Sequence, residues 1–143
     1  MNVGEIMTEN PACCTRTMGL EDVAKLMVEH DCGCIPVVDD EGSKMPVGMI
    51  TDRDITCRIV AKGRNPLDLT AGDAMSSTVV SVTPETSVDD CCVLMEESKL
   101  RRIAVVDENG KCCGIVAQAD IAMTAQPEDV AEVVEGVSQS AAR

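Results

Sequence analysis

The sequence predicts an α+β protein in which one β-α-β-β-α unit occurs twice. Residues 3–42 align with residues 71–110 when the chain is shifted by 68 positions. After a two-residue insertion the match continues at an offset of 66, with "GMITDRDI" at 48–55 and "GIVAQADI" at 114–121. Both copies alternate apolar, strand-like stretches with helical apolar stripes. Repetition at a fixed spacing indicates a duplicated structural unit.

In the first repeat, the stretch "MGLEDVAKLMVEH" is expected to be a helix because its apolar residues share one helical face. These residues are Leu20, Val23, Ala24 and Met27. Short apolar stretches on either side, the last two joined by an acidic turn with a glycine, indicate strands. Gly63 is a candidate C-cap of the final helix. The expected elements are a strand at 11–15, a helix at 18–30, strands within 34–42 and at 48–51, and a helix at 52–63.

The second repeat shows the same order, starting from the strand-like "TVVSVT" at 78–83. Thr86 or Ser87 is expected to cap the helix that follows. Asn109-Gly110 in "DENGK" is a strong hairpin signal. The apolar stripe of the helix consists of Val88, Cys91, Cys92 and Met95. The predicted organisation is repeat one at 1–62, a linker at 63–70, repeat two at 71–126 and an acidic C-terminal helix or tail at 127–143.

Composition narrows the function classes. The formal charge of −13 disfavours generic binding to nucleic acid or to an anionic membrane. No apolar run reaches the length of a membrane span, and the N-terminus lacks signal-peptide features, so a cytoplasmic location is expected. The chain has no Phe, Tyr or Trp, so a bound base would need an aliphatic slot. The lone histidine, His30, has no evident catalytic partner, and no enzyme activity is expected.

The repeated motifs resemble those of a CBS-domain pair, also called a Bateman module. The resemblance covers about residues 1–125 and rests on the "EIMT" opening, on "IPVVD", and on the pattern G-h-h-T-x-x-D-h, where h is apolar. It implies two sheets packed face to face around a pseudo-twofold axis, with two clefts between the units. It also implies a regulatory sensor, commonly a dimer, that binds AMP, ADP, ATP or S-adenosylmethionine and requires no cofactor.

Two interpretations of T-x-x-D stand side by side. Thr51 and Asp54 have the spacing of a helix capping box, and an acidic residue suits the positive end of a helix. An Asp facing a cleft can also accept hydrogen bonds from both hydroxyls of a ribose. In the resembling family the Asp holds ribose and the Thr lies near ribose and phosphate. The second motif keeps Asp120 but has Ala117 in place of the threonine.

Basic residues indicate where a phosphate would lie in so acidic a chain. Arg101 and Arg102 precede the strand "IAVVD", where the first repeat has Gly33 and Cys34. In the resembling fold this segment lines the clefts, although a solvated surface position is the alternative. The first expected site contains Thr51, Arg53 and Asp54, completed by Leu100 and Arg101. The second contains Asp120, Arg101 and Arg102, with Thr8, Cys32 and Gly33. Ile35, Ile103 and their neighbours would enclose the adenine.

Three functions remain open at this stage. The first is a stand-alone adenine-nucleotide sensor that acts on an unseen protein partner. The second is a ligand-free dimerisation or scaffold module. The resemblance implies a homodimer that forms through apolar helix faces. The third is a thiol-based metal or redox sensor using His30, Cys32 and Cys34. The nine cysteines contain no C-x-x-C spacing, so reduced structural thiols are expected rather than a metal site.

Overall fold

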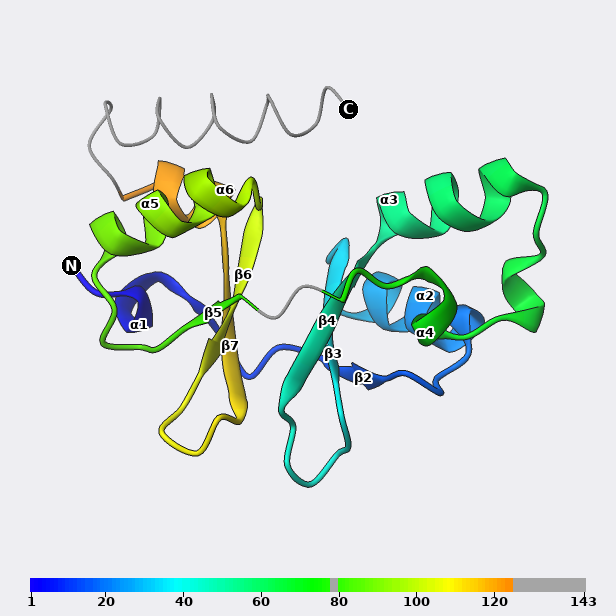
Figure 1. Cartoon of the computed structure of the whole chain (residues 1–143), viewed down its shortest axis with the longest axis horizontal. Helices are drawn as coiled ribbons and strands as arrows, with labels where there is room; N and C mark the ends of the chain where they lie inside the picture. The colour runs from blue at the N-terminus through cyan, green and yellow to red at the C-terminus, as the bar shows by residue number, and fades with distance from the viewer. Residues whose placement is uncertain (78–79, 125–143) are drawn as a thin grey trace. The chain divides into compact units, whose positions relative to one another are not determined.

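The computed structural model describes residues 1–77 and 80–124 (Figure 1). The predicted tail at 127–143 and residues 78–79 of the predicted strand lie outside this range. The helices are α1 (Val3–Ile6), α2 (Leu20–Glu29), α3 (Asp52–Asp54), η1 (Ile55–Ile59), η2 (Val60–Lys62), η3 (Pro66–Asp68), α4 (Ala71–Ala74), α5 (Val88–Ser98) and α6 (Gln118–Ala122). The strands are β1 (Thr8–Glu9), β2 (Cys14–Thr15), β3 (Cys34–Val38), β4 (Pro46–Thr51), β5 (Ser81–Val82), β6 (Arg102–Val106) and β7 (Cys112–Ala117).

The α+β class and the order β-α-β-β-α are confirmed in both repeats, from β2 to η2 and from β5 to α6. The chain forms two compact units. Among the described residues, unit 1 contains Met1–Asn10, Val80–Asn109 and 113–124, and its sheet has the order β1-β7-β6-β5. Unit 2 contains 11–77 and Gly110–Cys112, and its sheet has the order β2-β3-β4.

The compact units differ from the sequence repeats because each repeat gives its opening segment to the other. In unit 1, β1 from the first repeat pairs antiparallel with β7 of the second, Thr8 opposite Ile115. In unit 2, Ser76 from the second repeat forms an antiparallel bridge with Met49 of the first, with N–O distances of 2.8 and 3.0 Å. The contiguous repeats that the sequence shows are therefore interleaved in space.

The glycine that opens each repeated motif lies where this exchanged segment passes. A Cβ on Gly48 would collide with the backbone carbonyl of Ser76. A Cβ on Gly114 would lie 2.5 Å from the Met7 sulfur and 3.1 Å from the Thr8 carbonyl oxygen. Only a residue without a side chain lets the two backbones approach so closely. The glycine is thus a packing requirement in both motifs.

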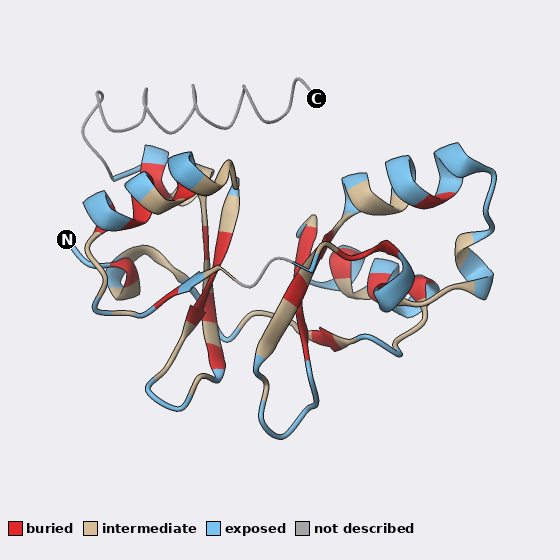
Figure 2. Ribbon diagram, viewed as in Figure 1, coloured by how far each residue is buried: buried red, intermediate tan, exposed pale blue. Residues whose placement is uncertain are grey.

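Each unit has its own hydrophobic core (Figure 2). All five residues of β3 are buried, and α2 covers the unit 2 core with Leu20, Val23 and Met27. Ala24, predicted on the same face, is exposed, and Leu26 packs partly against the core instead. The predicted stripe of α5 is confirmed, since all four residues are buried. Each fully buried aliphatic side chain contributes about 1.5–3 kcal/mol, so these cores need no aromatic residue.

The predicted helix ends are found where the sequence places them. Ser87 Oγ accepts a hydrogen bond from the Asp90 backbone N–H at 3.0 Å and caps α5. Gly63 follows η2 with φ of +76°, the left-handed geometry of a helix C-cap. The expected helix at 52–63 is not uniform, however, because a π-helical turn, η1, interrupts it. The expected linker at 63–70 contains the turn η3, and the Leu69 carbonyl accepts from the Leu20 N–H of unit 2.

Candidate ligand-binding site

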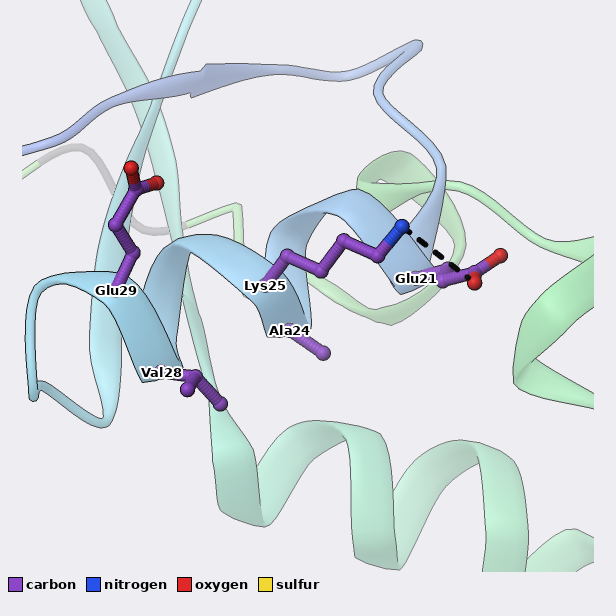
Figure 3. A pocket seen from close by; sticks show the side chains of 5 residues that line it. All are labelled: Glu21, Ala24, Lys25, Val28 and Glu29. Atoms are coloured by element: carbon purple, nitrogen blue, oxygen red, sulfur yellow. Dashed lines mark ion pairs between the residues drawn. The ribbon is translucent and has the colours of Figure 1, made fainter.

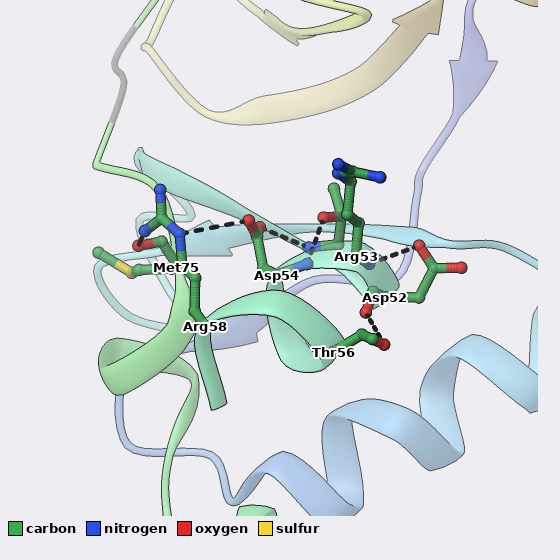
Figure 4. Close-up of polar contacts among 7 residues, drawn as sticks. Asp52, Arg53, Asp54, Thr56, Arg58 and Met75 are labelled. Atoms are coloured by element: carbon green, nitrogen blue, oxygen red, sulfur yellow. Dashed lines mark hydrogen bonds and ion pairs between the residues drawn. The ribbon is translucent and has the colours of Figure 1, made fainter. Parts of the chain in front are cut away.

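Thr51 and Asp54 form a complete capping box at the junction of β4 and α3 (Figure 4). Thr51 Oγ1 accepts a hydrogen bond from the Asp54 backbone N–H at 3.1 Å. Asp54 Oδ2 accepts one from the Thr51 backbone N–H at 3.0 Å. The strand ends here because both backbone donors are satisfied by side chains and the chain turns into a helix. The capping interpretation of the motif is therefore correct, and the Asp54 carboxylate is held in one orientation.

Arg58 is the residue that the sequence analysis left out of the site. Its Nε lies 3.6 Å from Asp54 Oδ1, and its Nη1 donates a hydrogen bond to the Met75 carbonyl at 3.2 Å (Figure 4). The Asp54 side chain is 16% exposed and that of Arg58 is 53% exposed. The four-residue spacing on a helix was the available signal for the pair. The contact with Met75 joins segments far apart in the chain and has no local signal.

The start of β3 lies beside the capped turn. The Asp52 N–H donates to the Gly33 carbonyl at 3.0 Å, and Cys34 is opposite Thr51 in the β3–β4 ladder. Arg53 is exposed, and Figure 4 shows its side chain extending away from the helix. Unit 2 thus gathers seven of the predicted residues in β3, β4 and their flanking turns. They are Cys32, Gly33, Cys34, Ile35, Thr51, Arg53 and Asp54.

The second motif repeats this arrangement in unit 1 with fewer polar groups. Asp120 Oδ2 accepts from the Ala117 N–H at 2.8 Å, but alanine offers no oxygen in return. The position matching Arg58 is Thr124, whose hydroxyl donates to the Asp120 carbonyl oxygen at 3.3 Å. Within residues 1–77 and 80–124, no ion pair to the Asp120 carboxylate is found. Within the described part of the chain, one hydrogen bond positions the second carboxylate.

The Gln118 N–H donates to the Arg101 carbonyl at 2.8 Å, the counterpart of the Asp52–Gly33 bond. Arg101 is exposed and Arg102 is half-buried at the start of β6. Unit 1 therefore contains the other predicted residues, Thr8, Leu100, Arg101, Arg102, Ile103 and Asp120. Any pairing of these residues with those of unit 2 stays a prediction.

Ile35 and Ile103 lie in the cores of their own units, with exposures of 1% and 0%. Their predicted contact with adenine would require the core around them to open. The aliphatic slot that the sequence calls for stays a prediction.

A shallow hollow lies elsewhere, on the outer surface of α2 (Figure 3). Its polar groups include Lys25, whose Nζ lies 3.7 Å from Glu21 Oε1 on the next turn. Lys25 is 70% exposed and its charge is already matched, so the hollow offers no converging donors for a phosphate. The residues that line it are Glu21, Ala24, Lys25, Val28 and Glu29.

The alternative metal site at His30, Cys32 and Cys34 finds no support among the described residues. Within the described residues, no group of three or more His, Cys, Asp and Glu side chains is placed to hold a metal ion. Cys34 is buried, with its thiol 3.4 Å from the Met49 sulfur, whereas Cys32 is exposed. His30, Cys32 and Cys34 are therefore not a metal centre in this structure.

No helix within residues 1–77 and 80–124 combines the length and the apolar character needed to cross a bilayer.

Comparison with known proteins identifies the family. The CBS domain family matches the chain twice, at residues 3–61 and 71–125. The CBS domain-containing protein YhcV of Bacillus subtilis is 37% identical over 122 residues, covering 85% of this chain and 84% of YhcV. Hypoxic response protein 1 of Mycobacterium tuberculosis is 32% identical over 133 residues, covering 93% of this chain and 91% of that protein.

Solved structures agree with this assignment. Hypoxic response protein I with two coordinated zinc ions has a TM-score of 0.76 at 32% identity, covering 88% of this chain and all of the other. CBSX2 in complex with AMP has a TM-score of 0.71 at 28% identity, covering 87% and 95%. The CBS domain pair of MJ0100, in complex with 5'-methylthioadenosine and S-adenosylmethionine, has a TM-score of 0.75 at 26% identity, covering 86% and 94%. This chain belongs to the CBS domain family, and it carries two tandem copies of the domain.

Proposed function

We propose that the chain is a regulatory module that binds an adenosine-containing ligand at the Thr51–Asp54 motif. AMP, ADP, ATP and S-adenosylmethionine are the candidate ligands, and the module passes the binding event to a protein partner. The single observation that carries the proposal is the Asp54 carboxylate, which is fixed by a backbone N–H and flanked by two arginines. Relatives of known structure bind AMP, or 5'-methylthioadenosine with S-adenosylmethionine.

The Asp54 carboxylate has acceptor capacity left for a ribose. Its two oxygens offer about four lone-pair positions, and the hydrogen bond from the Thr51 N–H uses one. The Arg58 Nε lies 3.6 Å away, which is an ion pair rather than a close hydrogen bond. The vicinal hydroxyls of a ribose are both donors and fit the remaining positions. A small movement of Arg58 would then open the carboxylate fully.

Arginines supply the local charge that a phosphate needs on a chain with formal charge −13. Arg53 is exposed one residue before Asp54, and Arg58 is half-exposed beside it. Guanidinium groups bind phosphate oxygens in a bidentate manner. The second motif has Ala119 and Thr124 at these positions, so we assign the stronger nucleotide site to the first motif.

The test is calorimetric titration of the purified protein with AMP, adenosine and S-adenosylmethionine, together with thermal shift. A ligand at 100 times its Kd is expected to add about 2.7 kcal/mol of stability. Asp54→Ala should abolish most of this gain, while Asp68→Ala, an acidic residue on the exposed turn η3, should leave it unchanged. The proposal fails if no candidate ligand shifts the unfolding transition, or if Asp54→Ala and Asp68→Ala behave alike.

A second candidate is a ligand-free dimerisation or scaffold module. It is favoured by large apolar side chains that lie exposed on helices, among them Val28, Val60 and Val93 with exposures of 84%, 53% and 49%. Such side chains are available to a subunit interface, and we expect a homodimer under either function. Light scattering across micromolar concentrations tests this: a monomer mass throughout would contradict the dimer. Ligand titration then separates the two functions.

A further inference from the structure

Cys13 and Cys112 lie side by side although they are far apart in the sequence. Cys13 directly precedes β2, and Cys112 is the first residue of β7; both group with unit 2. The Cys13 Sγ donates a hydrogen bond to the Pro11 carbonyl at 3.4 Å and is itself hydrogen-bonded by the Cys112 thiol. The Cys112 N–H donates to the Lys44 carbonyl at 2.8 Å, which fixes the strand start beside the β3–β4 turn.

The surroundings of Cys13 favour its thiolate. The hydrogen bond from Cys112 is the main influence that lowers the pKa of Cys13, and the positive charge of Lys44 lowers it further. Partial burial and the neighbouring Cys14 act in the opposite direction, but the net shift is downward. Burial instead raises the pKa of Cys14 and that of Cys91 to about 11. The thiolate is the nucleophilic form of cysteine, so Cys13 is activated where Cys14 is not.

Access also differs between the two thiols. Cys13 is partly exposed, so a small oxidant can reach it, whereas Cys112 is buried with an exposure of 6%. An accessible, activated thiol beside a shielded one is the arrangement of an attacking and a resolving cysteine. The two thiols thus lie within hydrogen-bond reach of each other.

We propose that Cys13 and Cys112 are a redox-active pair that forms a reversible intramolecular disulfide when the protein meets a hydroperoxide. The Cys13 thiolate attacks the peroxide oxygen, which breaks the O–O bond and gives a sulfenic acid; with hydrogen peroxide, the departing hydroxide takes up a proton to become water. The Cys112 sulfur then attacks the sulfenic sulfur; the S–S bond forms as the S–O bond breaks, and the Cys112 thiol proton passes to the departing hydroxyl, which leaves as a second water. Two electrons pass from the two thiols to the peroxide, and a dithiol reductant reverses the change by exchange.

The disulfide would constrain a long stretch of the chain. It joins cysteines that are 99 positions apart in the sequence (112 − 13), and the stabilising effect of a cross-link grows with loop length. Both cysteines group with unit 2, so the bond would constrain that unit. In a reducing compartment such a bond is transient and suits a sensing role. This inference does not depend on nucleotide binding.

The experiment is exposure of the full chain to a small excess of hydrogen peroxide, followed by non-reducing mass spectrometry. We expect a mass loss of about 2 Da, the two thiol hydrogens, with no change in oligomer mass. The cross-linked protein should melt roughly 5–10 °C higher than the reduced protein, and dithiothreitol should reverse both changes. Protease mapping of the oxidised wild type should join the Cys13 and Cys112 peptides, a result that needs no variant to fold.

Matched serine variants identify which two cysteines form the bond, because each member of the pair has a neighbouring cysteine that serves as its control. Cys13→Ser and Cys112→Ser should each abolish the 2 Da loss, while Cys14→Ser and Cys113→Ser should retain it. The exposed Cys57 provides a further control, and Cys57→Ser should behave as wild type. The proposal is overturned if Cys13→Ser still forms the intramolecular bond, if mapping joins other cysteines, or if peroxide only adds oxygen to the wild type.

Discussion

The two repeated motifs share a backbone but differ in the side chains that hold their carboxylates. In the first, Asp54 exchanges two hydrogen bonds with Thr51 and forms an ion pair with Arg58. In the second, Asp120 accepts one hydrogen bond from the Ala117 N–H. Glycine, aspartate and the strand-to-helix turn are thus the shared structural elements. The hydroxyl and the arginines are additions to one motif, which is where we place ligand binding.

The glycines provide the largest expected difference between the units. Gly48→Ala should cost about 3 kcal/mol of unfolding free energy, because its Cβ meets the rigid Ser76 carbonyl. Gly114→Ala should cost about 1 kcal/mol, because its nearest contact is the flexible end of the Met7 side chain. Urea unfolding measures both. Equal losses would mean that the two exchanged segments are held with similar rigidity.

Removal of the two motif carboxylates should have the next largest effect, on nucleotide binding. Asp54→Ala should weaken nucleotide binding by about 1.5–3 kcal/mol, the range for hydrogen bonds to a charged group. Asp120→Ala should weaken it less, because that motif lacks the hydroxyl and the arginines. Calorimetric titration of both variants compares the motifs directly. A greater loss from Asp120→Ala would move the main site to the second motif.

Removing the capping threonine from the first motif, and adding one to the second, tests how much the cap contributes to stability. Thr51→Ala removes the acceptor of the Asp54 N–H and should cost about 1 kcal/mol of stability. Ala117→Thr supplies the missing acceptor for the Asp120 N–H and should add up to about 1 kcal/mol. The measurement is thermal unfolding without ligand. If Ala117→Thr does not raise the unfolding stability, the hydroxyl at position 117 does not reach the Asp120 N–H.

The arginines should have the smallest effect on folding and a selective effect on binding. Arg58→Gln should change stability by about 0.5 kcal/mol or less, since a half-exposed ion pair is weak. Arg53→Ala should weaken AMP more than adenosine, because a guanidinium meets phosphate and not ribose. The ratio of the two dissociation constants is the readout. An unchanged ratio would return Arg53 to the role of a solvated surface residue.

Local signals in the sequence predicted the parts of the fold that depend on neighbours in the chain. The cap at Ser87, the left-handed Gly63 and the Thr51–Asp54 box all follow from residues within one turn of a helix. The contact of Arg58 with the Met75 carbonyl joins residues in different repeats and has no sequence pattern. The thiol pair at Cys13 and Cys112 was missed for the same reason.

Burial explains the remaining differences. Ile35 is in the core because both faces of β3 are covered, which a run of apolar residues alone does not reveal. Ala24 lies on the exposed face of α2, since the stripe that packs inward runs through Leu26. Helical spacing identified the buried side of α2 but not every residue that lies on it.

Because the two repeats exchange their opening segments, cleaving the chain between them should not give two independent domains. A cut at the exposed Arg64 would leave one fragment ending before Ser76 and another beginning without Thr8, so each would lack a segment that completes its own unit. Each fragment also carries the piece that the other lacks. The two halves should therefore stay associated after the cut and reassemble when mixed. A single repeat expressed alone would lack the opening segment that completes its unit. We therefore expect it to associate with a second copy instead of folding as an independent domain.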